Sequence, residues 1–566
     1  MKTFNNLKPY QEPKLVESLR QLAQSNADTY GDKDFYVYKQ NGETITVSYN
    51  DFNNIVRAFG TGLYKLGLAG KTIAISGDTH PYWTAAFIAV ISTGGVAVPL
   101  DRDLDTEEAA GFLKIAECSA VVYTASLTKK FKEIAEKLPM EYYIPVTPEE
   151  DDAMSFDKII EIGQAALDEG DDFFDTNELD MDKMSILLFT SGTTGTSKGV
   201  MLSHNNIICC INASCNATQY CKDDKFVSVL PIHHTYELAA GQLALSNQGA
   251  SMFICEGLRY ATRNFKEYKP TALVLVPLFL ETVHKRIWDE IKRKGMEKKV
   301  RAGMAFSDSM LKLGVDLRPK LFSEVTAAFG GELHSIVCGG APIDPQILRD
   351  FYSFGITVHQ GYGITECSPL VAVNRPGNIK FDSVGQPVDN CEVKIVPLED
   401  GEGKGDEGEI LVRGGNVMLG YYKNEEATRA AFTSDGWYRT GDVGKMNKQG
   451  FITITGRLKN IIIASNGKNV FPEELEEHLM KIEAVKECVV VGREESGNVT
   501  ITAVIVPNLE VLGESSSDTA ISFVLKEAIA QINRTLPAYK HINKFEIRHE
   551  DFERTLSKKI KRFLVK

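Results

Sequence analysis

The sequence lacks the features of a membrane-spanning, disulfide-bonded or zinc-binding chain. Its ten cysteines include no Cys-x-x-Cys pair, so neither a zinc site nor a disulfide framework is expected. The longest apolar stretch, Trp83 to Leu100, is interrupted by Ser-Thr-Gly-Gly, which predicts a short buried helix and a short strand instead of a membrane span. The opening MKTFNNLKPYQEPK has no apolar secretory core. We therefore expect a cytoplasmic protein with reduced thiols.

Positive charge is also scarce, which argues against a nucleic-acid partner. The net charge is −13, with 43% hydrophobic and 25% charged residues, a composition typical of a soluble globular protein without a broad basic face. An anionic ligand must then be held by local cations or by a metal. At 566 residues the chain is expected to form two or more domains.

Apolar strand patterns alternate with helical ones along most of the chain, which predicts an α/β fold with mostly parallel strands. An Asn41-Gly42 turn predicts an early hairpin. From about Phe381 the pattern changes to short β segments, and beyond Arg457 it indicates a small α+β unit. We predict a large, multi-layer N-terminal domain of α/β sheets with a small β subdomain, residues 1–456. A small, mobile α+β C-terminal domain, residues 457–566, follows it.

One stretch in the middle of the chain is strongly basic. TALVLVPLFLETVHKRIWDEIKRKGMEKKVRAGM begins as a buried strand and continues as a long helical segment with many cations between Lys285 and Arg301. These cations could meet an anionic partner, but a solvated helix face is the favoured interpretation.

The clearest signal for chemistry is LLFTSGTTGTSKGVMLSH, from Leu187 to His204. Gly, Ser and Thr between two apolar runs predict a loop whose N–H groups and hydroxyls surround phosphate oxygens. Lys198 is followed by glycine, so this is not a Walker A loop. The same letters fit the Gly-x-Ser-x-Gly motif of a serine hydrolase with Ser197 as nucleophile. We regard that as a remote alternative, because the strand ends near Phe189, well before the first glycine of the motif.

Three further segments complete a nucleotide-binding set. YRTGD ends in Asp442, a carboxylate able to accept hydrogen bonds from ribose hydroxyls, and Arg457 follows as a planar donor for ribose or phosphate oxygens. GYGITE supplies Tyr362 as an aromatic face for a purine and Glu366 as a carboxylate for Mg²⁺. Each residue taken alone has a structural explanation, and the combination with the phosphate loop indicates function.

These motifs resemble, in order, those of the adenylate-forming superfamily of acyl-CoA synthetases, adenylation domains and luciferases. The resemblance runs from about Leu66 to the C-terminus. It covers TSGTTGTSKG, LPIHHTYE, CGGAPI, GYGITE, YRTGD and GRLKNIIIASNGKNVFPEELE. The last motif is ERTLSKKIKR, where Lys558 replaces the usual glycine. Alignment on Thr555 makes Lys559 the catalytic lysine, with Lys558 as the alternative.

The resemblance implies a role for each of these positions. Lys559, His234 and Glu366 are expected to be catalytic, Lys459 to be the hinge, and Thr190 and Glu366 to hold Mg²⁺. The expected ATP- or AMP-binding residues are Thr190, Ser191, Gly192, Thr193, Thr194, Gly195, Lys198, Gly340, Ala341, Pro342, Gly361, Tyr362, Gly363, Thr365, Asp442 and Arg457. The loop on the coenzyme A side is expected to contain Ser465, Gly467 and Lys468.

The implied reaction uses ATP, Mg²⁺ and coenzyme A. A carboxylate attacks the α-phosphorus, pyrophosphate leaves, and the coenzyme A thiol then takes the acyl group after the small domain rotates. The segment after VPLFLETV, with IVCGGAPIDP and GYGITECSPLVAVNR, most resembles the bacterial long-chain fatty acyl-CoA synthetases. A medium-chain or aryl acid, an acyl-carrier-protein acceptor and a catalytically silent nucleotide-binding module remain open alternatives. Also open are the oligomeric state and peripheral contact with lipid at the inner membrane face, for which the basic C-terminal tail is a candidate.

Overall fold

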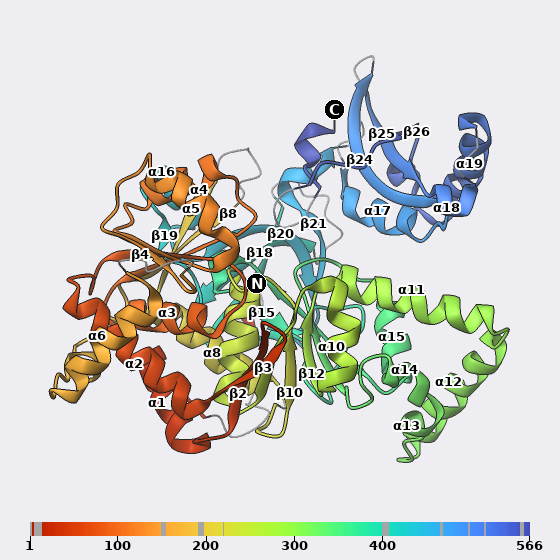
Figure 1. The fold of residues 1–566 in the computed structure, drawn as a ribbon. Helices are drawn as coiled ribbons and strands as arrows, with labels where there is room; N and C mark the ends of the chain where they lie inside the picture. The colour runs from red at the N-terminus through yellow and green to blue at the C-terminus, as the bar shows by residue number, and fades with distance from the viewer. Residues whose placement is uncertain are drawn as a thin grey trace.

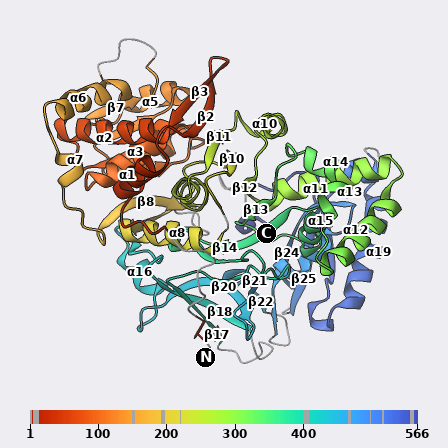
Figure 2. The same cartoon turned by 90° about the horizontal axis from the view of Figure 1, so that it is seen from below.

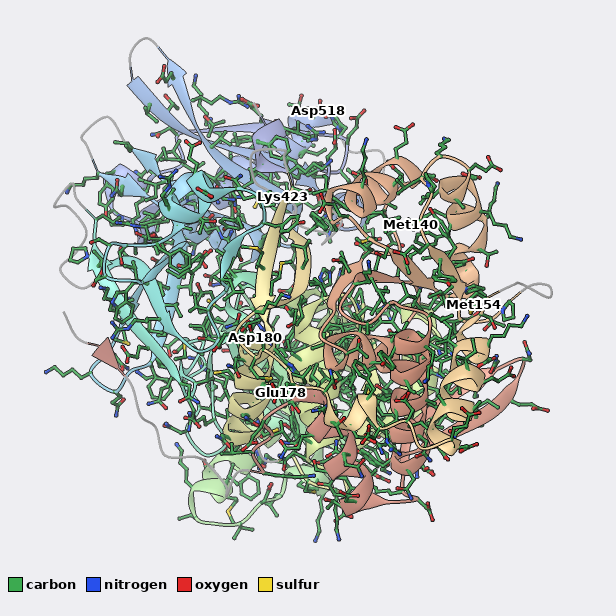
Figure 3. The ribbon with its side chains drawn as sticks, turned by 90° about the vertical axis from the view of Figure 1, so that its left-hand side faces the viewer. Met140, Met154, Glu178, Asp180, Lys423 and Asp518 are labelled. Carbon is green, nitrogen blue, oxygen red and sulfur yellow. The ribbon has the colours of Figure 1, made fainter. Side chains whose placement is uncertain are left out.

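The protein is a mixed α/β structure with a large N-terminal and a small C-terminal domain, as predicted (Figure 1). The structure is a computed structural model. It describes residues 3–4, 14–148, 154–190, 197–218, 220–398, 407–463, 468–495, 498–513, 517–554 and 560–565. Figure 3 shows the packed layers from the side, with the small domain, marked by Asp518, at the top.

A seven-stranded sheet forms the N-terminal part of the large domain. Its order is β19-β9-β8-β5-β4-β6-β7, and its central strands are parallel. The strands are β4 Thr72–Ser76, β5 Val96–Leu100, β6 Ala120–Tyr123, β7 Tyr142–Pro145, β8 Met184–Thr190, β9 Lys198–Ser203 and β19 Gly420–Tyr421. Helices around it are α1 Leu19–Tyr30, α2 Tyr49–Lys65, α3 Pro81–Ser92, α4 Thr106–Ile115, α5 Thr128–Ala135 and α6 Phe156–Asp168. The rejected membrane span is thus α3 followed by β5, as the sequence predicts.

A nine-stranded sheet carries the edge at which the candidate site lies. Its order is β16-β15-β14-β13-β12-β10-β11-β2-β3. The strands are β2 Asp34–Gln40, β3 Glu43–Ser48, β10 Lys225–Ser228, β11 Ser251–Ile254, β12 Ala272–Leu275, β13 Ser335–Cys338, β14 Thr357–Gly363, β15 Leu370–Val373 and β16 Gln386–Pro387. The predicted hairpin is confirmed, since Gln40 pairs with Glu43 across Asn41-Gly42. The strands from β11 through β10, β12 and β13 to β14 are parallel, so their carboxyl ends share one edge.

Helices α3 and α8 His204–Ala217 are buried along almost their whole length. In α3 apolar residues surround the axis instead of forming one stripe, whereas α8 also buries polar side chains such as Asn206, which donates to the carbonyls of Gly415 and Val417. Both belong to one large core together with residues of the two sheets. A second core under the nine-stranded sheet includes α10 Ala261–Tyr268 and α15 Pro345–Ser353. The candidate site therefore rests on a rigid support.

The small β subdomain is a five-stranded antiparallel sheet in the order β1-β17-β18-β20-β21. Its strands are β1 Thr3–Phe4, β17 Cys391–Pro397, β18 Glu407–Gly414, β20 Tyr438–Met446 and β21 Ile452–Arg457, with α16 Glu425–Ala431 before β20. The C-terminal domain has its own core. It contains β22 Ile462–Ile463, β23 Asn469–Val470, α17 Pro472–Met480, β24 Val485–Glu495, β25 Asn498–Pro507, α18 Leu509–Leu512, α19 Asp518–Thr535 and β26 Lys544–Ile547.

Between β12 and β13 the chain leaves the large domain as a helical arm, defined here as residues 277–327. It contains α11 Pro277–Arg293, α12 Glu297–Lys312, α13 Arg318–Leu321 and α14 Ser323–Ala327, and it projects from the periphery in both ribbon views (Figures 1 and 2). The predicted basic helical segment is present but is broken, because Gly295 adopts φ +67° between α11 and α12. Within the described part of the chain, no helix is long and apolar enough to cross a bilayer.

Candidate active site

The predicted phosphate loop connects β8 and β9, an antiparallel pair in which Thr190 lies opposite Lys198. The Thr190 hydroxyl donates to the Lys198 carbonyl at 3.4 Å, and the Lys198 Nζ lies 4.7 Å from the centre of the Tyr421 ring. The loop residues Ser191, Gly192, Thr193, Thr194 and Gly195 lie outside the described residues. The two flanking strands therefore hold Thr190 and Lys198 at the base of the loop.

Ser197 is exposed and directly precedes β9. A nucleophile elbow requires a helix immediately after the nucleophile. Because a strand and not a helix follows Ser197, the structure lacks the context that a hydrolase nucleophile needs. This agrees with the low rank that the sequence gives to the hydrolase alternative.

Three of the predicted residues, Tyr362, Asp442 and Arg457, form one cluster around the buried Asp442 carboxylate, the nucleotide-side cluster. The Tyr362 hydroxyl donates to Asp442 Oδ2 at 2.6 Å, and Arg457 Nε lies 2.8 Å from Asp442 Oδ1. Asp442 and Arg457 face each other across β20 and β21, which fixes their contact by strand register. The Asp442 backbone N–H also donates to the Thr440 hydroxyl at 3.0 Å. Asp442 is only 2% exposed, so partners hold its carboxylate in one orientation.

Burial and charge act together on this cluster. Burial, and then the neighbouring Asp442 carboxylate, raise the pKa of Tyr362 well above its usual range, so its hydroxyl remains a donor. Burial opposes the charge of Arg457, but Asp442 and other nearby anionic groups outweigh it and raise the pKa of Arg457. Asp442 is thus an oriented carboxylate beside a fixed cation. Roles of these residues toward ribose, purine or phosphate stay predictions.

Glu366 follows β14, in the short turn Thr365–Cys367. Its Oε1 accepts a hydrogen bond of 3.1 Å from the Tyr421 hydroxyl. The Lys198 ammonium group lies over the ring of the same tyrosine. Burial, and next the Glu366 carboxylate, raise the pKa of Tyr421. Tyr421 therefore links Glu366 to the base of the phosphate loop. Thr365 is partly exposed beside Glu366.

His234 lies after the carboxyl end of β10 and is exposed. Its ring centre is 4.1 Å from that of His233, which is buried with Nε2 at 3.5 Å from Asp101 Oδ2. Burial first, and then the two neighbours His234 and Arg102, lower the pKa of His233 well below its usual value. His233 is thus a neutral support, and His234 is the histidine presented at the sheet edge.

A small apolar cavity of about 80 Å³ lies beside these residues. Its wall comes from α8, from a π-helix at Tyr236–Leu243 and from the ends of β13, β14 and β15; Ala217, Tyr236, Ala240, Val337, Tyr362 and Leu370 are among the lining residues. Predicted residues Gly340, Gly361 and Gly363 line it too. A Cβ on Gly363 would lie 2.2 Å from the Pro369 carbonyl oxygen, so only glycine fits.

The remaining predicted residues lie at the margins. Ala341 and Pro342 are exposed in the loop between β13 and α15. Lys459 is exposed in the turn after β21, and Lys468 lies 4.9 Å from the centre of the Tyr539 ring in the small domain. Ser465, Gly467 and the lysine pair Lys558 and Lys559 lie outside the described residues. The contribution of the small domain to the site therefore stays a prediction.

Sequence reasoning missed the residues that join the parts of the site. Tyr421 connects Glu366 with Lys198, and Tyr236 donates to the carbonyls of Leu275 and Val337 at 3.2 and 3.1 Å, which ties β12 to β13 beside the cavity. Tyr421 stands in the unremarkable run GYYKN, and nothing local distinguishes it. A π-helix, which is common at functional sites, has no sequence signature.

Comparison with known proteins assigns the chain to a family. The family model for AMP-binding enzymes matches residues 23–422, and the model for the AMP-binding enzyme C-terminal domain matches residues 459–565. The chain belongs to the AMP-binding enzyme family. The predicted adenylate-forming superfamily, with its acyl-CoA ligase members, is thereby confirmed.

Similar AMP-binding enzymes cover almost the whole chain. The long-chain-fatty-acid–CoA ligase FadD15 of Mycobacterium bovis is 28% identical over 94% of this chain and 93% of its own length. The chloroplastic long-chain-fatty-acid–[acyl-carrier-protein] ligase AEE15 of Arabidopsis thaliana is 28% identical over 89% of this chain and 78% of its own length. ATP-bound MatB from Rhodopseudomonas palustris has the same fold, with a TM-score of 0.74, 23% identity and coverage of 97% and 98%.

Proposed function

We propose that this AMP-binding enzyme activates a long-chain fatty acid with ATP and transfers the acyl group to coenzyme A. The observation that carries the proposal is the position of Tyr362. Its ring lines the apolar cavity, and its hydroxyl donates to Asp442 in the nucleotide-side cluster. One short segment at the carboxyl end of β14 thus joins an apolar cavity, where we propose that the acyl chain begins, to a group of oriented polar side chains suited to a nucleotide.

The nucleotide is proposed to lie along the nucleotide-side cluster and the phosphate loop. An ionised carboxylate has about four lone-pair sites, so Asp442 can accept hydrogen bonds from ribose hydroxyls while it keeps Tyr362 and Arg457. Lys198 and the Thr190 hydroxyl stand at the base of the loop, where the β- and γ-phosphates would leave as pyrophosphate. Gly340, Ala341 and Pro342 would contact the adenine side.

The donor set at the phosphate loop fits Mg²⁺, because the Glu366 carboxylate and the Thr190 hydroxyl are hard oxygen ligands that can share an ion with phosphates. When bound, Mg²⁺ would neutralise charge on the phosphate oxygens. Within the described residues, no cluster of three or more His, Cys, Asp or Glu side chains could hold a metal without such a substrate.

Adenylation requires two anions to meet, since both the acid and ATP are negatively charged. We propose that Lys559 bridges the carboxylate and the α-phosphate, and that the carboxylate oxygen attacks phosphorus as pyrophosphate leaves. His234, exposed after the carboxyl end of β10 and two residues before the cavity-lining Tyr236, would orient the carboxylate. The thiolate sulfur of coenzyme A then attacks the acyl carbon and AMP leaves.

The second step needs a different face of the small domain. We propose residues 1–456 and 457–566 as the two moving units and Lys459 as the hinge, with Ser465, Gly467 and Lys468 facing the thiol afterwards. The units already touch closely at this point: a Cβ on Gly456 would lie 2.7 Å from the Phe471 ring. A small residue there permits the close approach.

The identity of the acid rests on the apolar lining of the cavity and on the fatty-acid ligases among the relatives. ATP–pyrophosphate exchange with Mg²⁺ and acids from acetate to oleate, with benzoate included, tests it. We expect exchange to peak at a long chain. A maximum with benzoate or a short acid would overturn the fatty-acid assignment but keep adenylation, and no exchange with any acid would favour the silent module.

The acceptor is tested separately, because one of the similar proteins is a ligase for acyl-carrier protein. Thioester formation is measured with free coenzyme A and with holo acyl-carrier protein at matched thiol concentration. We expect faster turnover with coenzyme A. A strong preference for the carrier protein would replace coenzyme A as the acceptor while keeping the adenylation step.

The position of the chain in the cavity is tested with Ala240→Phe. Ala240 lines the cavity from the π-helix, and a phenyl ring there would fill space that a long chain needs. We expect kcat/KM for oleate to fall about 10- to 100-fold, the range for a misfit of about 1–3 kcal/mol, with octanoate less affected and the KM for ATP unchanged. Equal losses for both acids would place the chain elsewhere.

A further inference from the structure

The helical arm has an electrostatic character opposite to that of the whole chain. Residues 277–327 contain eleven Lys and Arg against seven Asp and Glu, a net charge of +4, whereas the chain carries −13. Lys298, Lys299, Lys312 and Lys320 are exposed, and among the described residues none of them forms an ion pair. The arm therefore carries positive charge that no carboxylate of the described residues pairs with.

The same arm exposes large apolar side chains, here called the arm patch: Phe306 at 56%, Leu313 at 76%, Val315 at 43% and Leu321 at 48% exposure. Phe306 and Leu313 are seven residues apart, two helical turns, and so lie on one face of α12 or directly beyond its end. Single exposed apolar residues are ordinary, but four of them within sixteen residues, flanked by lysines, form a patch.

The patch does not arise from a poorly folded arm. The opposite face of α12 is buried through Met304, which packs with Trp288, Phe322 and Phe354. Trp288 Nε1 donates to Asp350 Oδ2 at 3.0 Å, and this carboxylate also lies 2.8 Å from His284 Nε2, which fastens α11 to α15. The arm thus has a stable inner face, and its apolar outer face is presented on a rigid support.

We propose that the arm patch and its lysines dock the protein onto an anionic lipid bilayer. Apolar side chains on an amphipathic helix enter the boundary between headgroups and acyl chains, while long lysine side chains keep their ammonium groups at the phosphates. A second copy of this chain fits the surface less well, because symmetric pairing of two arms would bring two positively charged surfaces together.

The position of the arm suggests how docking would help the enzyme obtain its acid, an argument that rests on the proposed function. α11 begins two residues after β12 ends at Leu275, and the neighbouring strand β13 and the loop after it supply Val337 and Gly339 to the apolar cavity. Docking would therefore hold the protein at the phase in which a long-chain acid dissolves, with α11 connecting the docked arm to the cavity side of the sheet.

The test is partition of the full-length protein onto phosphatidylcholine vesicles with and without phosphatidylglycerol, measured by flotation without substrates. Phe306→Ser with Leu313→Ser should lower partition onto the mixed vesicles about 10-fold or more, as expected for losing apolar burial. Lys298→Glu with Lys299→Glu and Lys312→Glu should abolish the preference for phosphatidylglycerol. Phe523→Ser, at a residue 64% exposed on α19, is the matched control and should not change partition.

Several outcomes would overturn the docking surface. These are wild-type partition that ignores phosphatidylglycerol, equal partition of the arm variants and the Phe523 control, or a wild-type dimer that the apolar variant dissociates in light scattering. ATP–pyrophosphate exchange with octanoate checks folding and should be the same in all variants. Absence of this exchange with the whole acid panel would contradict the proposed function without affecting the vesicle result. If the apolar variant misfolds, the lysine variant and lipid-dependent fluorescence of Phe306→Trp, relative to wild type, decide the question.

Discussion

The candidate site and the helical arm both adjoin the carboxyl edge of the nine-stranded sheet, but their side chains differ in burial and in pairing. The candidate site turns inward, where Asp442 is 2% exposed and its two oxygens meet Tyr362 and Arg457. The helical arm turns outward, where Leu313 is 76% exposed and Lys298, Lys299 and Lys312 have no carboxylate partners among the described residues. The site carboxylate is held in one orientation by hydrogen bonds and an ion pair, whereas the exposed side chains of the arm remain accessible to another molecule.

The largest effect on activity is expected for Lys559, the residue through which we propose that the small domain completes the candidate site. Lys559→Ala should reduce acyl-adenylate formation about 10³-fold, the scale for losing one preorganised charge at a transition state. Thioester formation from pre-made acyl-adenylate should remain largely intact, because the second step does not use this lysine. Both half-reactions are measured in single turnovers.

Lys558→Ala is the matched control for this prediction, since it removes the adjacent lysine. If Lys558→Ala has the larger effect, the motif alignment is displaced by one residue. If Lys559→Ala lowers both half-reactions equally, thermal unfolding distinguishes a damaged domain from a wrong assignment.

Asp442→Asn removes the negative charge that pairs with Arg457 and accepts the hydrogen bond of Tyr362. The new amide keeps the shape but faces Arg457 with loss of the charge, so exchange should fall about 100-fold and the KM for ATP should rise. The loss of stability should be about 1–3 kcal/mol. Exchange kinetics and urea unfolding measure the two effects.

Glu409→Gln supplies a control from the same sheet. Glu409 is a buried carboxylate paired with a half-exposed Arg439 at 2.8 Å, as Asp442 is with Arg457. It should lose comparable stability and keep its exchange activity. Equal losses of activity would mean that Asp442 acts only as a structural partner.

A buried acid in the inward region gives the next effect, which depends on pH. Glu237 is fully buried in the π-helix, with Oε1 near the Ser228 hydroxyl, and burial raises its pKa to about 8. The folded protein keeps this proton up to pH 8, whereas the unfolded chain releases it near pH 4.5. Its contribution to stability is therefore present at low pH and is lost as pH rises from 4.5 to 8.

Glu237→Gln should remove this pH dependence. The free energy of unfolding of the variant minus that of wild type should be larger at pH 8 than at pH 5.5, by on the order of 3 kcal/mol. Unfolding in urea at the two pH values measures it. An unchanged difference between the two proteins would show that Glu237 is ionised in the folded state.

The contrast between the two regions also explains what could be predicted. Strand patterns, Gly-rich loops and residue spacing follow local rules, so the α/β class, the Asn41-Gly42 hairpin and the motifs that contain Asp442 and Arg457 could be anticipated. The bond from Tyr362 to Asp442 spans 80 positions, and the link through Tyr421 spans 55 positions to Glu366 and 223 positions to Lys198. The cavity wall likewise brings Ala240 together with residues from Ser214 to Val373. Such contacts depend on how the sheets pack, and single-sequence patterns do not contain them.

The arm shows the converse limit. Its basic composition is evident from the sequence and favours a solvated face, but the break at Gly295 and the alignment of Phe306 with Leu313 come only from the structure and are the basis of the docking proposal. A charge run is a property of the sequence, whereas an apolar patch between lysines exists only once the helices are placed.

The smallest effect is expected where the arm meets the small domain. Lys292 Nζ lies 3.8 Å from Glu483 Oε1, and both side chains are at least half exposed. Water screens such a pair, so its coupling should be below about 0.5 kcal/mol. A double-mutant cycle with Lys292→Ala and Glu483→Ala should therefore be additive in unfolding and in both half-reactions. Coupling in the thioester step alone would mean that the arm restrains the small domain, and the separation between the inward and the outward region would then not hold.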